Sequence, residues 1–197
     1  MNHRHFLIHK PYGYLSQFKY ELKRNKKLLG DFYDFPEGIM AIGRLDEDSE
    51  GLLLLTTDGK VSDYICSSKV DKEYYVQVDG IITEEAISKI KKGVEIGFEG
   101  TKYITKPCQA YILESIPDFG PRAKKIRDER HGPTSWVSIT VNEGKFRQVR
   151  KMTSAVGFPT LRLVRVRVGT ILLNDLKAGE VLEISDFQIL ETNPIIK

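Results

Sequence analysis

The run of four leucines at 52–55 is the feature of the sequence that most constrains the fold. It lies between Gly51 and an Asp58-Gly59 turn signal. A short, continuous apolar run with such boundaries predicts a strand that is buried on both faces. We therefore expect the rest of the chain to be organised around this strand.

The segment in front of the strand is unusually acidic. Asp46, Glu47, Asp48 and Glu50 crowd into the turn that leads to it, and Arg44 lies among them. Neighbouring carboxylates repel one another, so the turn gains no stability from them, and carboxylates with perturbed pKa values are typical of functional sites. Composition alone favours a solvated acidic loop, and both interpretations stay open at this point.

Periodicity elsewhere in the chain predicts an α+β fold with a largely antiparallel central sheet and a few flanking helices. One half-buried strand alternates, with Tyr74, Val76 and Val78 on one side. Thr83 suits the N-cap of a helix, and Gly93 suits its end. Strands are expected at 6–9, 52–55, 73–78, 106–113, 136–141, 161–168, 172–173 and 181–184, with an apolar run at 39–42, and further helices at 58–65 and 147–156.

The strand at 161–168 contains two patterns that are out of phase. From Val164 onward, valines alternate with Arg165 and Arg167, whereas the leucines before Val164 occupy the opposite phase. This mismatch predicts a bulge near Leu163-Val164. Arg165 and Arg167 are expected to project together from one face of the strand.

Positive charge is concentrated in one part of the chain. Between Asn142 and Arg167, seven cations face one anion, so this segment carries +6 while the whole chain carries +3. The segment 117–133 is also rich in charge and has no periodicity, which is typical of functional or disordered loops. These features indicate a polyanionic partner at one face, with a solvated basic surface as the alternative.

Composition and motif spacing argue against several other classes of protein. The 197 residues are 41% hydrophobic and 29% charged, which suits a globular chain that buries its own core. No apolar run reaches the length of a membrane span and no signal-peptide core is present, so a cytoplasmic location is expected. Cys66 and Cys108 are predicted to be reduced, buried thiols. The histidines lack metal-ligand spacing, and phosphate-loop and serine-hydrolase motifs are missing from the sequence.

Four motifs, in order along the chain, resemble the RNA pseudouridine synthases. Residues 43–53 (GRLDEDSEGLL) resemble the catalytic segment of that family, with Ser49 where threonine is more usual. Residues 10–11 (KP) resemble the first motif, 72–76 (KEYYV) the tyrosine motif, and 143–152 (EGKFRQVRKM) the late basic motif. None of the four would be specific by itself, but their order makes the resemblance specific.

The resemblance implies a role for individual residues. It makes Asp46 the catalytic nucleophile, Tyr74 the active-site tyrosine, and Arg150 the cation that pairs with Asp46 and lowers its pKa. For Lys10, a structural role in a turn is the alternative to a role at the site. The residues expected to contact RNA are Arg44, Lys10, Lys145, Arg147, Lys151 and Arg165.

The resemblance also implies a substrate and an organisation. The expected activity is isomerisation of a uridine in ribosomal RNA, with the 23S RNA of the large subunit as the expected partner, by a monomer that needs no metal or other cofactor. Residues 1–192 are expected to form one catalytic domain of two subdomains that share a sheet, and 193–197 a frayed tail. This branch of the family usually carries an N-terminal S4 domain. Here the catalytic domain already begins near residue 6, so RNA affinity is expected to come from it alone.

Two other functions compete with this hypothesis. A non-catalytic RNA-binding or ribosome-assembly protein could keep the same fold and bind RNA in the same salt-dependent way. A hydrolase could use Asp46 and release free uracil.

Overall fold

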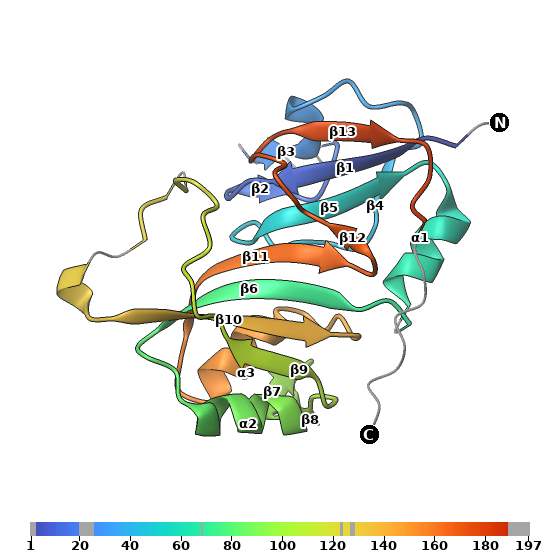
Figure 1. Cartoon of the computed structure of the whole chain (residues 1–197). Coiled ribbons are helices and arrows are strands. Elements are labelled where there is room, and N and C mark those ends of the chain that lie inside the picture. Colours follow the sequence, from blue (N-terminus) through green and yellow to red (C-terminus); the bar gives the residue numbers. More distant parts are fainter. Residues whose placement is uncertain (1–2, 20–25, 68, 123, 127–128, 189–197) are drawn as a thin grey trace.

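A nine-stranded sheet forms the centre of the computed structural model (Figure 1). The structure describes residues 3–19, 26–67, 69–122, 124–126 and 129–188, so the predicted tail at 193–197 lies outside the described residues. The strand order is β13-β1-β5-β11-β6-β10-β9, with β12 on β11 and β4 on β5. The strands are β1 His5–Lys10, β4 Met40–Ala41, β5 Glu50–Thr56, β6 Lys72–Asp79, β9 Gln109–Ile112, β10 Thr134–Val141, β11 Thr160–Val168, β12 Ile171–Leu172 and β13 Val181–Ile184.

The sheet is mostly antiparallel, which confirms the predicted fold class. Among the strand pairs described for this sheet, the exception is β5 with β11, which are parallel where Glu50 and Gly51 lie opposite Val164 and Arg165. This parallel pair lies in the middle of the sheet, directly after the acidic turn. The turn therefore opens onto the centre of the molecule.

The leucines of β5 are buried on both faces, as predicted. Leu52 and Leu54 pack into one apolar cluster, together with Ile65. Leu53 and Leu55 pack into a second cluster on the other side, together with side chains of β1. All four leucines have at most 1% of their surface exposed.

In the described part of the chain, three α-helices accompany the sheet: α1 Gly59–Cys66, α2 Glu84–Lys92 and α3 Gln148–Ala155. Asp58 caps α1, and Thr83 caps α2 by accepting a hydrogen bond from the Ala86 amide. A third apolar cluster joins α2 and α3 to one face of β6, β10 and β9. Figure 1 shows both helices at the β9 end of the sheet, whereas Ile65 of α1 packs with Leu52 and Leu54 of β5. Cys66 is exposed at the end of α1, so only the prediction for Cys108 as a buried thiol is confirmed.

Shorter elements complete the fold. Two small ribbons stand apart from the sheet: β2 Tyr14–Leu15 with β3 Lys27–Leu28, and β7 Glu95–Phe98 with β8 Thr101–Ile104. Two 3-10 turns are η1 Leu29–Asp31 and η2 Glu129–His131, the second within the segment predicted to lack structure. The strand predicted at 106–113 begins only at Gln109, after Pro107 has interrupted the pairing.

The predicted bulge in β11 is in the wrong place. The register with β6 shifts between Thr160 and Arg162 and again between Arg165 and Arg167, on either side of Leu163-Val164. Between these two irregularities the alternation is regular, because β11 is buried on both faces, with Leu163 in the cluster of α2 and α3 and Val164 in the cluster of Leu52 and Leu54. The second irregularity lies beside Tyr74, which pairs with Arg165.

Gly51 allows β5 to enter the sheet directly after the acidic turn. Its φ is +105°, and a Cβ built on it would lie 2.3 Å from the Arg165 carbonyl oxygen. Only glycine adopts this backbone without strain while another strand approaches so closely. The Asp46 turn is therefore held at a fixed place relative to β11 and β6.

Candidate active site

The acidic turn is anchored by its apolar residue and by one serine. Leu45 is buried in the cluster on the β1 side of β5. The Ser16 hydroxyl donates to the Leu45 carbonyl oxygen at 2.8 Å and accepts from the Leu45 amide at 3.0 Å. The Ser49 amide closes the turn by donating to the Asp46 carbonyl oxygen at 3.0 Å. Asp46 therefore projects from a turn that is fixed on both sides.

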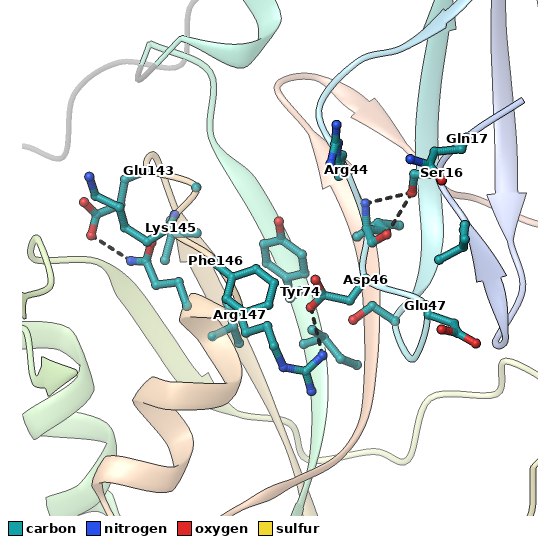
Figure 2. Close-up of a pocket in the computed structure, with 18 residues that line it drawn as sticks. Ser16, Gln17, Arg44, Asp46, Glu47, Tyr74, Glu143, Lys145, Phe146 and Arg147 are labelled. Atoms are coloured by element: carbon teal, nitrogen blue, oxygen red, sulfur yellow. Dashed lines mark hydrogen bonds and ion pairs between the residues drawn. The ribbon is translucent and has the colours of Figure 1, made fainter. Parts of the chain in front are cut away.

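Asp46 opens into a pocket of about 670 Å³ (Figure 2). Five of the predicted site residues line this pocket: Arg44, Asp46, Tyr74, Lys145 and Arg147. Figure 2 shows Tyr74 and Arg147 beside the Asp46 carboxylate, with Arg44 higher on the same side of the pocket. Clefts of this size are ordinary for ligand binding. The structure thus brings the predicted carboxylate, tyrosine and several cations to one place.

The ion-pair partner of Asp46 is Arg147. Its guanidinium lies 3.4 Å from an Asp46 carboxylate oxygen, and it donates two hydrogen bonds of 2.8 Å to Asp48. Arg147 precedes α3 in a left-handed conformation with φ 53°, which is uncommon for a residue with a side chain. The residue predicted to begin the helix instead stands outside it and reaches across to the acidic turn.

The prediction that Arg150 pairs directly with Asp46 is wrong. Arg150 donates to the Asp48 carbonyl oxygen at 2.7 Å and to the Ser49 hydroxyl at 3.2 Å, and its side chain is only 11% exposed. Its Nε is buried without a hydrogen-bond partner among the described residues. Arg150 thus holds the back of the turn, and spacing alone could not distinguish it from Arg147, three residues earlier.

The pKa of Asp46 is raised, contrary to the predicted decrease. Burial raises it most, Arg147 acts against the increase, and the neighbouring Asp48 charge adds to it. Burial also acts to raise the pKa of Asp48, but the hydrogen bonds from Arg147 and the positive charges of Arg150 and Arg147 together outweigh burial, and the pKa is lowered. The two carboxylates share one arginine but differ in how easily they take up a proton.

Tyr74 forms the opposite wall of the pocket. It lies on β6 between Ile139 of β10 and Arg165 of β11. The side chain is half-buried and packs against two apolar clusters, so its ring has a defined position. A fixed aromatic ring beside a carboxylate is suited to contact a planar base.

Comparison with known proteins identifies the family of the chain. The family model described as RNA pseudouridylate synthase matches residues 4–155. The chain belongs to the RNA pseudouridine synthase family. Its members are isomerases, and the Asp46 turn and Tyr74 both fall within the matched residues.

Curated relatives place the chain more narrowly within the family. It is 43% identical over 181 residues to ribosomal large subunit pseudouridine synthase E of Vibrio vulnificus, covering 91% of this chain and 74% of the relative. It is 42% identical over 165 residues to the protein of that name from Xanthomonas axonopodis pv. citri, covering 83% and 84%. A crystal structure of a pseudouridylate synthase is 28% identical with a TM-score of 0.74, covering 92% of this chain and 70% of that chain.

Two of the predicted RNA contacts in this pseudouridine synthase are buried. The Lys10 side chain is fully buried, donates to the carbonyl oxygens of Pro11 and Tyr14, and burial lowers its pKa to about 8. Arg165 is 4% exposed and donates to the Leu52 carbonyl oxygen. The predictions that Lys10 and Arg165 contact RNA are wrong, because both side chains donate to backbone carbonyl oxygens around the site. The alternative prediction for Lys10, a role in a turn, agrees with its contacts.

The segment from Asn142 to Arg167, which carries a net charge of +6, also does not form one basic surface. Arg162 is buried in an ion pair with Glu50 at 2.8 Å, and Arg167 pairs with Glu73 at 2.8 Å. Arg165 is buried apart from them, so Arg165 and Arg167 do not form the predicted pair on an open face. Arg162 and Arg165 therefore belong to the interior, and Arg167 is neutralised by Glu73, so these three of the seven cations do not form a surface for a polyanion.

The other predicted RNA contacts lie at the surface around the pocket. Arg44 is exposed on the rim. The Lys145 ammonium lies over the rings of Phe98 and Tyr103, at 4.7 and 5.1 Å, and Lys151 donates to the Gly97 carbonyl oxygen at 2.7 Å. Both lysines thus hold the β7–β8 ribbon against the site while remaining partly exposed.

Several residues of the pocket were not predicted. Ser16 and Gln17 come from the N-terminal segment, where nothing in the sequence marks them. Gln148 links the late motif internally: it accepts from the Lys145 amide and donates to Glu143. Phe146 stands in the quoted motif between two cations, a pattern that could have identified it.

The described residues contain no group of three or more metal-ligating His, Cys, Asp or Glu side chains. None of their helices is long and apolar enough to cross a membrane.

Proposed function

We propose that this enzyme converts a specific uridine of large-subunit (23S) ribosomal RNA to pseudouridine, with Asp46 as the nucleophile. The observation that carries this proposal is the position of Asp46. It is partly buried in a pocket large enough for a base, with Arg147 at 3.4 Å and Tyr74 on the opposite wall. The names of the relatives from Vibrio and Xanthomonas support the large subunit as the source of the RNA.

The reaction needs a group that forms a bond and then leaves. The bond between ribose C1′ and uracil N1 breaks, the base turns, and a bond from C1′ to C5 forms; C5 loses its proton and N1 takes one up, so the product is an isomer of the substrate. A carboxylate can both attack and leave, whether it bonds to the ribose or to the ring. Two carboxylates of the turn line the pocket: Asp46 lies beside Tyr74, whereas Glu47 is paired with Lys26, so we assign this step to Asp46.

The arginines prepare Asp46 for this step. Arg147 favours the ionised form of the carboxyl group against the effect of burial, and Arg150 also lowers its pKa from behind the turn. Asp48 fixes the Arg147 guanidinium through two parallel hydrogen bonds. We therefore propose that Arg147 and Arg150 divide the role that the motif gives to Arg150.

Tyr74 and Arg44 would receive the RNA. The target base must leave its stack, at a cost of a few kcal/mol. Stacking on the half-buried Tyr74 ring would recover about 1–3 kcal/mol. The exposed Arg44 would fill the gap that the base leaves or bind a neighbouring phosphate. Tyr74 is also a candidate for transferring the C5 proton.

We also propose that residues 1–192 act as one catalytic domain and as a monomer. β5, β6 and β11 belong to one sheet, and the segments that line the pocket lie on or beside these strands. Light scattering of the protein bound to RNA tests this: one protein per RNA is expected, and a stable dimer would contradict it.

One experiment separates the proposal from its rivals. Purified enzyme is incubated with unmodified transcripts that tile the large-subunit RNA, and pseudouridine and free uracil are both measured. We expect pseudouridine at one or a few uridines and no uracil. RNA binding without either product would favour the assembly protein, and released uracil would favour the hydrolase.

A further inference from the structure

Phe146 is an exposed aromatic residue at the rim of the catalytic pocket. It lines the pocket, yet 66% of its surface is exposed. In Figure 2 its ring lies between the Lys145 side of the pocket and the Asp46 carboxylate. An exposed phenylalanine gains little from packing, and exposed apolar side chains beside a cleft often mark a binding surface. Packing in the core of the protein therefore does not explain why Phe146 lies at the rim of the pocket.

The backbone on both sides of Phe146 is fixed. The Lys145 amide donates to the Gln148 side chain at 3.0 Å, and the Lys145 ammonium is held over Phe98 and Tyr103 of the β7–β8 ribbon. On the other side, Arg147 takes the left-handed conformation and binds Asp48. The ring is thus presented to solvent by a rigid segment, which reduces the entropy lost when it stacks on a ligand.

A cation lies next to the ring. The Lys151 ammonium is 5.4 Å from the centre of the Phe146 ring. It donates one hydrogen bond, to Gly97, at 2.7 Å, and an ammonium carries three donors, so this bond is compatible with a phosphate contact. An aromatic ring for a base with a cation for the backbone is how proteins bind single-stranded nucleic acid.

We propose that Phe146 and Lys151 form a second nucleotide subsite, which holds the nucleotide next to the target uridine. Phe146 stacks on the neighbouring base and Lys151 contacts the adjoining phosphate. Tyr74 is half-buried on the wall that faces Asp46 and suits the target base, whereas the more exposed Phe146 ring lies at the mouth, where the chain of the RNA must pass. This inference rests on the proposed function, because it requires an RNA substrate with its target base in the pocket.

The first test compares three variants on a transcript that the wild type modifies. Phe146→Ala should lower kcat/KM by about 10- to 100-fold, the range of one lost base stack, mainly through KM. Phe146→Trp should restore most of it, because the ring and not its exact size is needed. Ile116→Ala, which removes an 83% exposed side chain outside the pocket, is the control and should match the wild type.

The second test removes the neighbouring base instead of the side chain. Transcripts with an abasic nucleotide immediately 5′ or 3′ of the target are given to wild type and Phe146→Ala. An abasic nucleotide at one of the two positions should lower the kcat/KM of the wild type about 10- to 100-fold and leave that of Phe146→Ala nearly unchanged. The reason is that the abasic nucleotide and the substitution each remove one partner of the same stack.

The outcomes separate the two proposals. If the wild type forms no pseudouridine in any transcript, the proposed function fails. If the wild type is active but Phe146→Ala equals it, or if the abasic effects simply add at both positions, the subsite is refuted while the proposed function stands. A folded-state check by circular dichroism on each variant excludes loss of structure as the cause.

Discussion

At the scale of single residues, the site depends on two carboxylates that share one arginine. Asp46 has its pKa raised by burial, whereas the hydrogen bonds of Arg147 lower the pKa of Asp48. Asp48 is therefore the firmly ionised partner that holds Arg147, and Asp46 is the more basic group left facing the pocket. Different environments for adjacent carboxylates are a common way to give them different roles.

This difference predicts the pH dependence of the reaction. Asp46 must be ionised to attack, so kcat/KM should fall as the pH drops through its raised pKa. Arg147→Gln removes the strongest influence that lowers this pKa, so the acidic limb of the profile should move to higher pH while the maximal rate falls. Lys102→Gln, at an exposed ion pair on the β7–β8 ribbon, is the control. An acidic limb that stays in place or moves to lower pH would contradict the assignment.

The residues that sequence could and could not identify differ in physical terms. Tyr74 lies on a predictable strand, so the side that it occupies follows from the alternation of that strand. Asp46 lies in the turn before a predictable strand, and only the motif identified it. Lys10 and Arg165 looked like RNA contacts because sequence counts charge but not burial. Arg147 was assigned to the helix because no pattern signals a left-handed arginine, and the contact of Ser16 with Leu45 joins segments 29 positions apart.

At the scale of elements, the meeting of β5 with β11 positions the turn. The leucines predicted β5 and the valines predicted β11. The parallel pairing of the two strands could not be predicted in the same way, because it depends on contacts between residues more than 100 positions apart, such as Arg165 and Leu52. Gly51 is the position where this meeting is tightest.

A substitution at Gly51 tests the importance of this contact. Gly51→Ala places a Cβ 2.3 Å from the Arg165 carbonyl oxygen at a φ of +105°. We expect the free energy of unfolding to fall by about 2–4 kcal/mol, from backbone strain and overpacking together. Gly59→Ala is the matched control, because its Cβ would meet no atom within 4 Å and its φ is ordinary. Chemical denaturation of both variants measures the difference, and equal stabilities would contradict the close approach.

At the scale of the whole molecule, the positive charge is divided between the interior and the pocket rim. Arg162 and Arg165 are buried and Arg167 is paired, so the surface available to RNA is smaller than the sequence suggested. Besides Arg147, which Asp48 holds, the cations at the pocket rim include Arg44 and the two lysines beside the β7–β8 ribbon. We therefore expect a compact electrostatic footprint around the pocket.

The salt dependence of RNA binding measures this footprint. Each phosphate contact adds roughly one unit to the slope of log affinity against log salt concentration. Lys151→Gln should reduce the slope by about 1, whereas Lys60→Gln, on α1, should leave it unchanged. Equal slopes for the two variants would show that the RNA does not pass over the α3 side of the pocket.

The most direct test of the account compares two neighbouring carboxylates in a single-turnover assay of pseudouridine formation. Asp46→Asn should abolish the product while RNA affinity stays within a few-fold of the wild type. Glu47→Gln, which removes an adjacent carboxylate that pairs with Lys26 at 2.7 Å, should retain most of the activity. Pseudouridine formed at the wild-type rate by Asp46→Asn would show that another group carries out the chemistry.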